Sequence, residues 1–300
     1  MTTTTAPAIA SAPAVKGRRA ISRSFWQTAW RRLARDRIAV VCGSILLLIL
    51  FTAIFAPLIA PFDPYRTSMS RRLLPIGDAR HWLGTDELGR DLLSRLIYGG
   101  RMSLFMGFVP VALATLIGGT LGVIAGYCGG AINMAIMRIT DVFYAFPSVL
   151  LAVAISGVLG AGLTNSLVSL TLVFTPPIAR IAESVTTQVR NQDYVEAARA
   201  TGASGWRIVT GHVLSNVTGP ILIYASSMIS VSIVIASGLS FLGLGVTPPH
   251  AEWGLMLNTL RQSIYVAPVN AILPGIMIFV TSMSMNLISD SLRASMDVKS

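Results

Sequence analysis

Residues 186–216 form a polar stretch between two long apolar segments, and they hold the residue types whose spacing points to chemistry. Asp193 and Glu196 have the spacing of a capping box, in which a polar side chain at a helix start is followed three positions later by a glutamate. The alanines that follow favour helix, and Gly202 suits the left-handed conformation in which helices often end. The sequence therefore predicts a short helix that Asp193 caps and Gly202 stops.

A second short helix is predicted after this glycine, starting at Ala203–Ser204. Its apolar face comprises Trp206, Ile208, Val209, Val213 and Leu214. Two helices separated by a glycine form a compact hairpin, and an apolar face of this kind must be covered by another surface. The chemistry that the stretch indicates is therefore binding. One alternative stays open, in which Glu196 only caps the helix and the stretch is a solvated linker.

Motifs for enzymatic chemistry are absent from the sequence. It has no G-x-x-x-x-G-K-[ST] phosphate loop, since its only lysines are Lys16 and Lys299, and no G-x-S-x-G elbow or H-E-x-x-H motif. The two cysteines, Cys42 and Cys128, form no spaced cluster with the three histidines. We therefore expect no catalytic residue, no metal site and no cofactor, and the chain has no phosphate loop with which to bind ATP itself.

The composition is that of a membrane protein. The 300-residue chain is 53% hydrophobic and 12% charged, with a mean hydropathy of +0.67, whereas a soluble domain is about 25% charged. The formal net charge of +10 fits loops that face anionic lipid. Because the sequence lacks the interleaved aromatic and basic residues of a nucleic-acid module, we expect membrane lipid as a partner and no nucleic acid.

Six apolar segments approach the length of about 20 residues that a helix needs to cross a bilayer. They are residues 38–60, 104–126, 142–160, 165–182, 220–242 and 269–289. The other parts are a basic N-terminal tail with an amphipathic helix (1–37), the connections 61–103, 183–219 and 243–268, and a C-terminal tail (290–300). In the fourth segment, Pro176 and Pro177 should kink or break the helix. The fold class is predicted to be an all-α polytopic membrane protein with six transmembrane helices.

Basic residues set the predicted orientation. A dense cluster from Lys16 to Arg37 directly precedes the first span, which favours a cytoplasmic N-terminus. With six spans, the C-terminus and residues 183–219 are then cytoplasmic too, while residues 61–103 and 243–268 lie outside. Ionisable residues avoid the middle of every span, which argues against an ion-coupled transporter.

Two patterns within or beside the spans concern helix packing and charge. Gly118, Gly122 and Gly126 recur at every fourth position and predict a close contact with another helix. Arg138 and Asp141 lie three positions apart, which is a spacing that allows pairing across one helical turn.

Two further stretches lie on the predicted outer side. Residues 81–104 hold nearly balanced acidic and basic side chains, and Thr85 or Asp86 is predicted to cap a helix that runs toward Tyr98. This part is either a contact site for partner proteins or a charge-balanced structural lid. The second stretch, residues 239–257, combines glycines, prolines and a tryptophan.

Three of these stretches resemble one known family. Glu196-Ala197-Ala198, Gly202 and His212-Val213-Leu214 resemble the EAA loop of ABC-importer permeases. Residues 81–104 and 239–257 resemble the dipeptide, oligopeptide and nickel branch of that family. The resemblance spans about residues 31–297, and it implies the type I ABC-importer permease fold, with a core at about residues 100–290.

The resemblance also implies a function. It indicates a permease subunit in the bacterial inner membrane that takes up peptides, or a related small solute such as nickel. Its partners would be a second homologous permease, two ATP-binding cassette ATPases and a solute-binding protein. The loop that couples it to the ATPases would comprise Asp193, Glu196, Ala197, Ala198, Gly202, Trp206, His212 and Leu214. A self-contained secondary transporter and a membrane-embedded enzyme are the alternatives.

Two positions depart from the family pattern. Ser215 stands where the family usually has proline, so the second hairpin helix could join the next span differently, with Gly219–Pro220 supplying the break. Ala236 stands where the family commonly has a glutamate, so any role of that glutamate in relatives is absent or moved here.

Overall fold

The computed structural model describes residues 33–296, so most of the predicted N-terminal tail and part of the C-terminal tail lie outside the described residues. Within this range the chain is helical, and its only β-bridge, between Thr85 and Asp91, is isolated. The longer helices are α2 (Arg37–Ile54), α4 (Leu92–Cys128), α5 (Gly130–Tyr144), α6 (Ser148–Leu159), α7 (Leu163–Arg190), α10 (Leu214–Phe241) and α12 (Pro268–Met296). The shorter ones are α3 (Ala56–Ile59), η1 (Met69–Arg71), α8 (Asp193–Ala200), α9 (Gly205–Ile208), η2 (Val209–Val213), α11 (Trp253–Leu260) and η3 (Arg261–Ser263).

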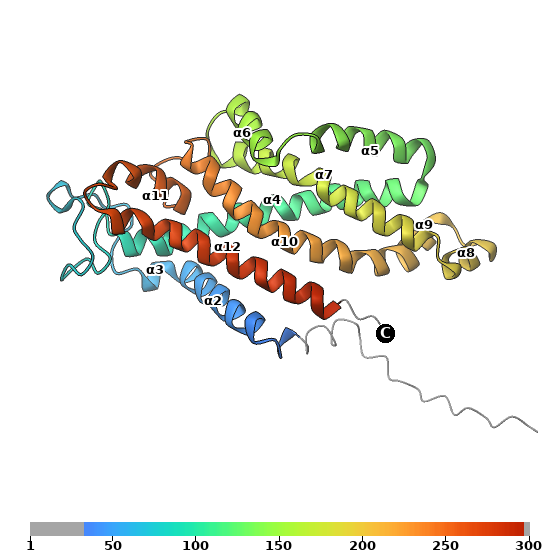
Figure 1. Ribbon diagram of the computed structural model, residues 1–300, viewed down its shortest axis with the longest axis horizontal. Coiled ribbons are helices and arrows are strands. Elements are labelled where there is room, and N and C mark those ends of the chain that lie inside the picture. The colour runs from blue at the N-terminus through green and yellow to red at the C-terminus, as the bar shows by residue number, and fades with distance from the viewer. Residues whose placement is uncertain (1–32, 297–300) are drawn as a thin grey trace, which may run out of the picture.

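Helices α4 and α7 pack against each other at the centre of the molecule (Figure 1). Three glycines of α4 lie along this contact. A Cβ atom added at Gly118 would lie 2.5 Å from the carbonyl oxygen of Thr175, and one at Gly126 would lie 2.7 Å from that of Glu183. An added Cβ at Gly122 would meet the carbonyl oxygen of Ala179 even more closely. The two backbones therefore touch, which only glycine permits.

The remaining long helices surround this pair. α10 crosses α4, where the Ser232 hydroxyl donates a hydrogen bond to the Met106 carbonyl at 3.1 Å. α12 packs against both α10 and α2. The hydroxyl of Ser291 donates to the Asp36 carboxylate at 2.6 Å, so the end of α12 is tied to the start of α2.

The third predicted span, residues 142–160, is not one helix. α5 ends at Tyr144 and α6 starts at Ser148, and the two are bent by 87° at the break between them. Pro147 stands at the N-cap of α6 with a φ of −55° and a ψ of 126°. Proline has no N–H to continue a helix and disfavours helical backbone at the residue before it, Phe146, so the chain turns here.

The two prolines of the fourth predicted span do not break the helix. α7 runs without a break from Leu163 to Arg190, with Pro176 and Pro177 inside it. Close packing of α4 against Thr175 and Ala179, on either side of the prolines, holds the helix together.

By length and composition, four described helical segments can cross a membrane: α2, α4, the continuous run Gly205–Phe241, and α12. There are five if the bent pair α5–α6 counts as one span. α7 has 28 residues but is less apolar, since it carries Arg180, Glu183 and Arg190. The number of six spans therefore stays a prediction. The α8–α9 region lies at one end of the molecule and α11 near the other, and the start of α2 and the end of α12 point toward the α8–α9 end but stop short of it (Figure 1).

Candidate functional site

The hairpin predicted from residues 186–216 begins with α8. The helix starts at Asp193, while Gln192 occupies the N-cap position without a side-chain hydrogen bond, so Asp193 is not the cap. Asp193 and Glu196 instead lie in the first turn and Arg199 in the last. This charge order complements the helix dipole, which favours acidic groups at the start and basic groups at the end.

Gly202 ends this helix in the left-handed conformation that its sequence position indicated. Its φ is +81°, and its N–H donates to the Arg199 carbonyl at 3.0 Å. The N–H of Ala203 donates to the Ala198 carbonyl at 3.1 Å, which completes a tight turn at the helix end. No atom lies within 4 Å of an added Cβ at Gly202, so the glycine serves backbone conformation and not close packing.

The second helix of the hairpin continues directly into the membrane helix that follows. Ser204 caps α9, and the five-residue π turn η2 joins α9 to α10. The expected break at Gly219–Pro220 does not occur, since α10 passes through Pro220. Ser215 also lies inside helix, where its hydroxyl donates to the Gly211 carbonyl at 3.2 Å. The second helix of the hairpin and α10 therefore form one continuous helical rod.

The buried side of the hairpin packs against the chain's own core. Val195, Ile208 and Val213 have 0–1% of their surface exposed and belong to the main hydrophobic cluster. Ala198 is partly buried against this cluster. The aromatic rings of Tyr194 and His212 lie 6.3 Å apart, which brings α8 close to η2. Tyr194 was not singled out in the sequence, although it directly follows Asp193.

The other face of the hairpin is open. Most residues predicted for the coupling loop are exposed: Asp193, Glu196, Ala197, Gly202, Trp206, His212 and Leu214. Trp206 has 77% of its surface exposed, so this chain does not itself cover that part of the predicted apolar face. A tryptophan and a carboxylate exposed on a rigid hairpin can bind another protein, because exposed aromatic residues are typical of interface centres.

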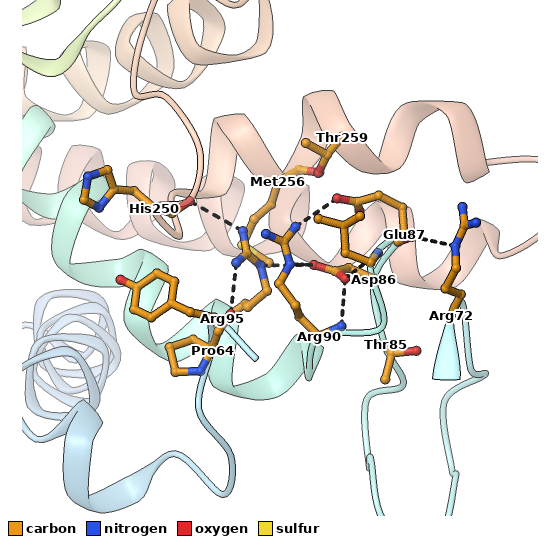
Figure 2. A network of polar contacts seen from close by, with 12 residues as sticks. Pro64, Arg72, Thr85, Asp86, Glu87, Arg90, Arg95, His250, Met256 and Thr259 are labelled. Carbon is orange, nitrogen blue, oxygen red and sulfur yellow. Dashed lines mark hydrogen bonds and ion pairs between the residues drawn. The ribbon is translucent and has the colours of Figure 1, made fainter. Parts of the chain in front are cut away.

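A buried network of charges lies beside the start of α4, at the end of the molecule away from the hairpin (Figures 1 and 2). Arg90 Nε lies 2.6 Å from Asp86 Oδ2 and Arg90 Nη2 lies 2.9 Å from Glu87 Oε1. Arg95 Nε lies 3.3 Å from the same Asp86 oxygen. Arg95 Nη1 also donates to the Pro64 carbonyl at 3.1 Å. The network fixes residues 64–90 onto the start of α4.

This network replaces the helix start that the sequence predicted at Thr85 or Asp86. α4 begins at Leu92, and its cap is Asp91, whose carboxylate accepts from the Ser94 N–H at 2.8 Å. Burial raises the pKa of Glu87, and the neighbouring Asp86 carboxylate raises it further.

A second buried carboxylate, Glu252, was missed in the sequence. It caps α11 by accepting from the N–H groups of Gly254 and Leu255 at 2.9 and 2.8 Å, and it accepts from the Ser103 hydroxyl at 3.1 Å. Burial raises the pKa of Glu252 despite these hydrogen bonds. Its position one residue before Trp253 was the available signal, because an acidic residue before a helix indicates a cap.

No group of three or more His, Cys, Asp or Glu side chains in residues 33–296 can hold a metal ion. Asp141 pairs with Arg180 of α7, and not with Arg138 as its spacing allowed. Two features remain. One is the open hairpin at one end of the molecule, and the other is the lobe formed by residues 61–91 and α11, which contains the buried ion pairs.

Comparisons with known proteins place these features in context. The family described as "Binding-protein-dependent transport system inner membrane component" matches residues 118–298, and "N-terminal TM domain of oligopeptide transport permease C" matches residues 24–75. A glutathione transport system permease protein, GsiD, of Pectobacterium atrosepticum is 40% identical over 92% of this chain and 92% of its own length. A dipeptide transport system permease protein, DppC, of Alkalihalophilus pseudofirmus is 40% identical over 92% of this chain and 90% of its own.

Solved structures share the fold. The methionine ABC transporter MetNI in an inward-facing conformation matches with a TM-score of 0.56 and 20% identity, over 68% of this chain and 97% of that one. An amino acid ABC transporter matches with a TM-score of 0.51 and 16% identity, over 66% of this chain and 92% of that one. At these identities the likeness concerns the fold alone.

Proposed function

The chain belongs to the family of binding-protein-dependent transport system inner membrane components, and we propose that it forms, with a second homologous permease, the path for peptides or a related small solute such as nickel. Members of this family are the membrane permease subunits of ABC importers, and ATP hydrolysis belongs to other subunits. The names of the dipeptide and glutathione permeases among its relatives support a peptide-like solute.

The observation that carries this proposal is the open hairpin and its rigid junction with α10. Glu196 and Trp206 are exposed on the hairpin, whereas Ile208 and Val213 fix it to the core. The rod from Gly205 to Phe241 has no break, so a force on the hairpin reaches the other end of α10. This supports the residues of the predicted EAA loop as the contact with one of the importer's two ATPase subunits.

The lobe at the other end is the proposed contact for a solute-binding protein. Residues 61–91 and α11 form it, and the buried pairs of Asp86, Arg90 and Arg95 keep it rigid. In this arrangement both chain termini and the hairpin are cytoplasmic, and the membrane is the bacterial inner membrane.

Purification from the native host in mild detergent tests the proposal. We expect the tagged chain to bring a second permease and ATPase subunits with it. The combined change Glu196→Ala and Gly202→Pro should abolish ATPase recovery while the chain still inserts, because proline cannot adopt a φ of +81° or donate the hydrogen bond to Arg199. Tyr265→Ala is the matched control, since Tyr265 is 97% exposed but lies between η3 and α12, far from the hairpin in the chain.

The outcomes separate the two function classes. Recovery of the chain alone, even after crosslinking, would contradict the permease proposal and favour a self-contained secondary transporter. Equal ATPase recovery by the hairpin variant and by Tyr265→Ala would leave the permease assignment in place but remove the hairpin from the contact.

A further inference from the structure

An ion pair lies on the surface of the helical bundle, beside the bend between α5 and α6. Asp141 of α5 and Arg180 of α7 form this pair, and the guanidinium carbon of Arg180 lies 5.1 Å from the ring centroid of Tyr144. The pair is only half covered, since the side chains of Arg180 and Asp141 are 51% and 42% exposed. Nothing in the proposed coupling to ATPases uses these three residues.

The pair lies beside the membrane-crossing helix α4, a short way inside one of its ends. Arg180 directly follows Ala179, whose carbonyl oxygen faces Gly122, six positions before the end of α4 at Cys128. At ~1.5 Å per residue, the pair lies roughly 9 Å inside that helix end. Its neighbours on α5 are apolar and exposed, including Ile139 at 64% and Val142 at 62%. A half-open ion pair among such residues is costly when it faces hydrocarbon.

A cavity of about 300 Å³ adjoins the pair. Tyr144 lines this cavity and also contacts Arg180, while Pro177, one helical turn before Arg180, lines it too. Phe143, Phe174 and Met228 contribute apolar surface from α5, α7 and α10. Charges inside membranes face a protein interior or a water-filled passage. Since this chain does not cover the pair, its open side must face water or a second subunit.

We infer that Asp141, Tyr144 and Arg180 line the water-filled translocation path, where the ion pair opens to bind the two opposite charges of a zwitterionic, peptide-like solute in transit. Arg180 offers a planar set of donors to a carboxylate, and Asp141 accepts from an ammonium group. Tyr144 adds an aromatic face for the cation. The inference rests on the proposed permease function and names a solute-contact site within it.

Water accessibility tests the location of the site. In the assembled importer in lipid nanodiscs, with Cys42 and Cys128 replaced by alanine, Tyr144→Cys is treated with a negatively charged methanethiosulfonate reagent. Leu47→Cys is the control, because Leu47 is 67% exposed on α2. We expect Tyr144→Cys to react on the order of tenfold faster or more, since a charged reagent is excluded from hydrocarbon. Equally slow reaction at both positions, with and without ATP, would overturn the inference.

Charge exchange tests the role of the pair. Asp141→Asn and Arg180→Gln are each expected to lower uptake of labelled dialanine or glutathione about tenfold, because each removes one charge-assisted hydrogen bond to the solute. The double change Asp141→Arg with Arg180→Asp restores an ion pair but reverses its direction. We expect it to recover assembly with the ATPases and not uptake.

Each result has a defined meaning. Full uptake by the exchanged pair, or by both single variants, would show a structural salt bridge and overturn the recognition role. A wild-type importer that carries neither labelled probe would overturn the solute class. Failure of the wild-type chain to assemble with ATPases would instead contradict the permease function itself. Where the charge variants fail to assemble, the Tyr144→Cys labelling still decides whether the path lies here.

Discussion

Single glycines decide how closely the two central helices approach. An added Cβ at Gly122 would meet the Ala179 carbonyl and lie 2.6 Å from the Ala182 Cβ, and neither atom is at the end of a flexible side chain. The helices must therefore separate to admit even one methyl group. We expect Gly122→Ala to destabilise the folded protein by about 1–3 kcal/mol, which is the usual cost of overpacking. The apparent melting temperature in detergent, followed by size-exclusion chromatography, measures this change.

A glycine on the same helix provides the control. At Gly119 the nearest atom to an added Cβ is Ile221 Cγ2, at 3.9 Å, so a methyl group fits. Gly119→Ala should be neutral or stabilising by about 0.5–1 kcal/mol, because alanine is the better helix former. If Gly122→Ala matched Gly119→Ala in melting temperature, the close contact between α4 and α7 would not limit stability.

At the scale of elements, the π turn η2 sets the angle at which the hairpin leaves α10. A π turn holds one more residue than an α-helical turn. Deleting Gly211 would remove that residue and rotate the hairpin by about 100° relative to α10. Ile208, which is 1% exposed, would then turn out of the core. We expect the deletion to insert into the membrane but to lose uptake and ATPase recovery by about tenfold or more.

Substitution at the same position separates rotation from local disturbance. No atom lies within 4 Å of an added Cβ at Gly211, so Gly211→Ala keeps both the register and the packing. This variant should behave like the wild type in the same uptake and purification assays. Normal uptake by the deletion variant would show that the register between the hairpin and α10 does not matter for coupling.

Elements that depend on local sequence were predicted well. Gly202 and the helices on either side of it follow from residues within a few positions, and the spacing of the α4 glycines indicates a packing face on its own. The bend between α5 and α6 was missed because the sequence is apolar on both sides of Pro147, from Val142 to Gly160, and such a run indicates one continuous span. The unbroken course of α7 through its prolines depends on α4, which no local pattern reveals.

Contacts between distant residues set the limit for predicting the site. The local spacing allowed Asp141 to pair with Arg138, three positions away, whereas its partner Arg180 is 39 positions along the chain. Likewise, Glu252 binds Ser103, 149 positions away, and this pairing leaves no local signal. Local spacing therefore identifies the hairpin, while the polar contacts among helices require the assembled bundle.

At the scale of the whole molecule, its two ends are predicted to face opposite sides of the membrane. Asp36 is hydrogen-bonded to Ser291, so the start of α2 and the end of α12 share one side, which is also the side of the hairpin (Figure 1). The basic residues before α2 favour the cytoplasm for that side. Labelling of single introduced cysteines with an impermeant maleimide measures this orientation, in a protein whose Cys42 and Cys128 are replaced by alanine.

Two exposed aromatic residues report the two sides in that assay. In spheroplasts, Tyr265→Cys should react readily, whereas Trp206→Cys should react only after the membrane is opened. Both side chains are well exposed, at 97% and 77%, and Trp206 belongs to α9, whereas Tyr265 follows α11, which lies toward the other end of the molecule (Figure 1). The chain is expressed without its partners, so that no ATPase covers the hairpin. The reverse labelling would place the hairpin outside, where no ATP is hydrolysed, and coupling through it would be impossible. Labelling of both positions in sealed spheroplasts would mean that the chain crosses the membrane an even number of times between Trp206 and Tyr265.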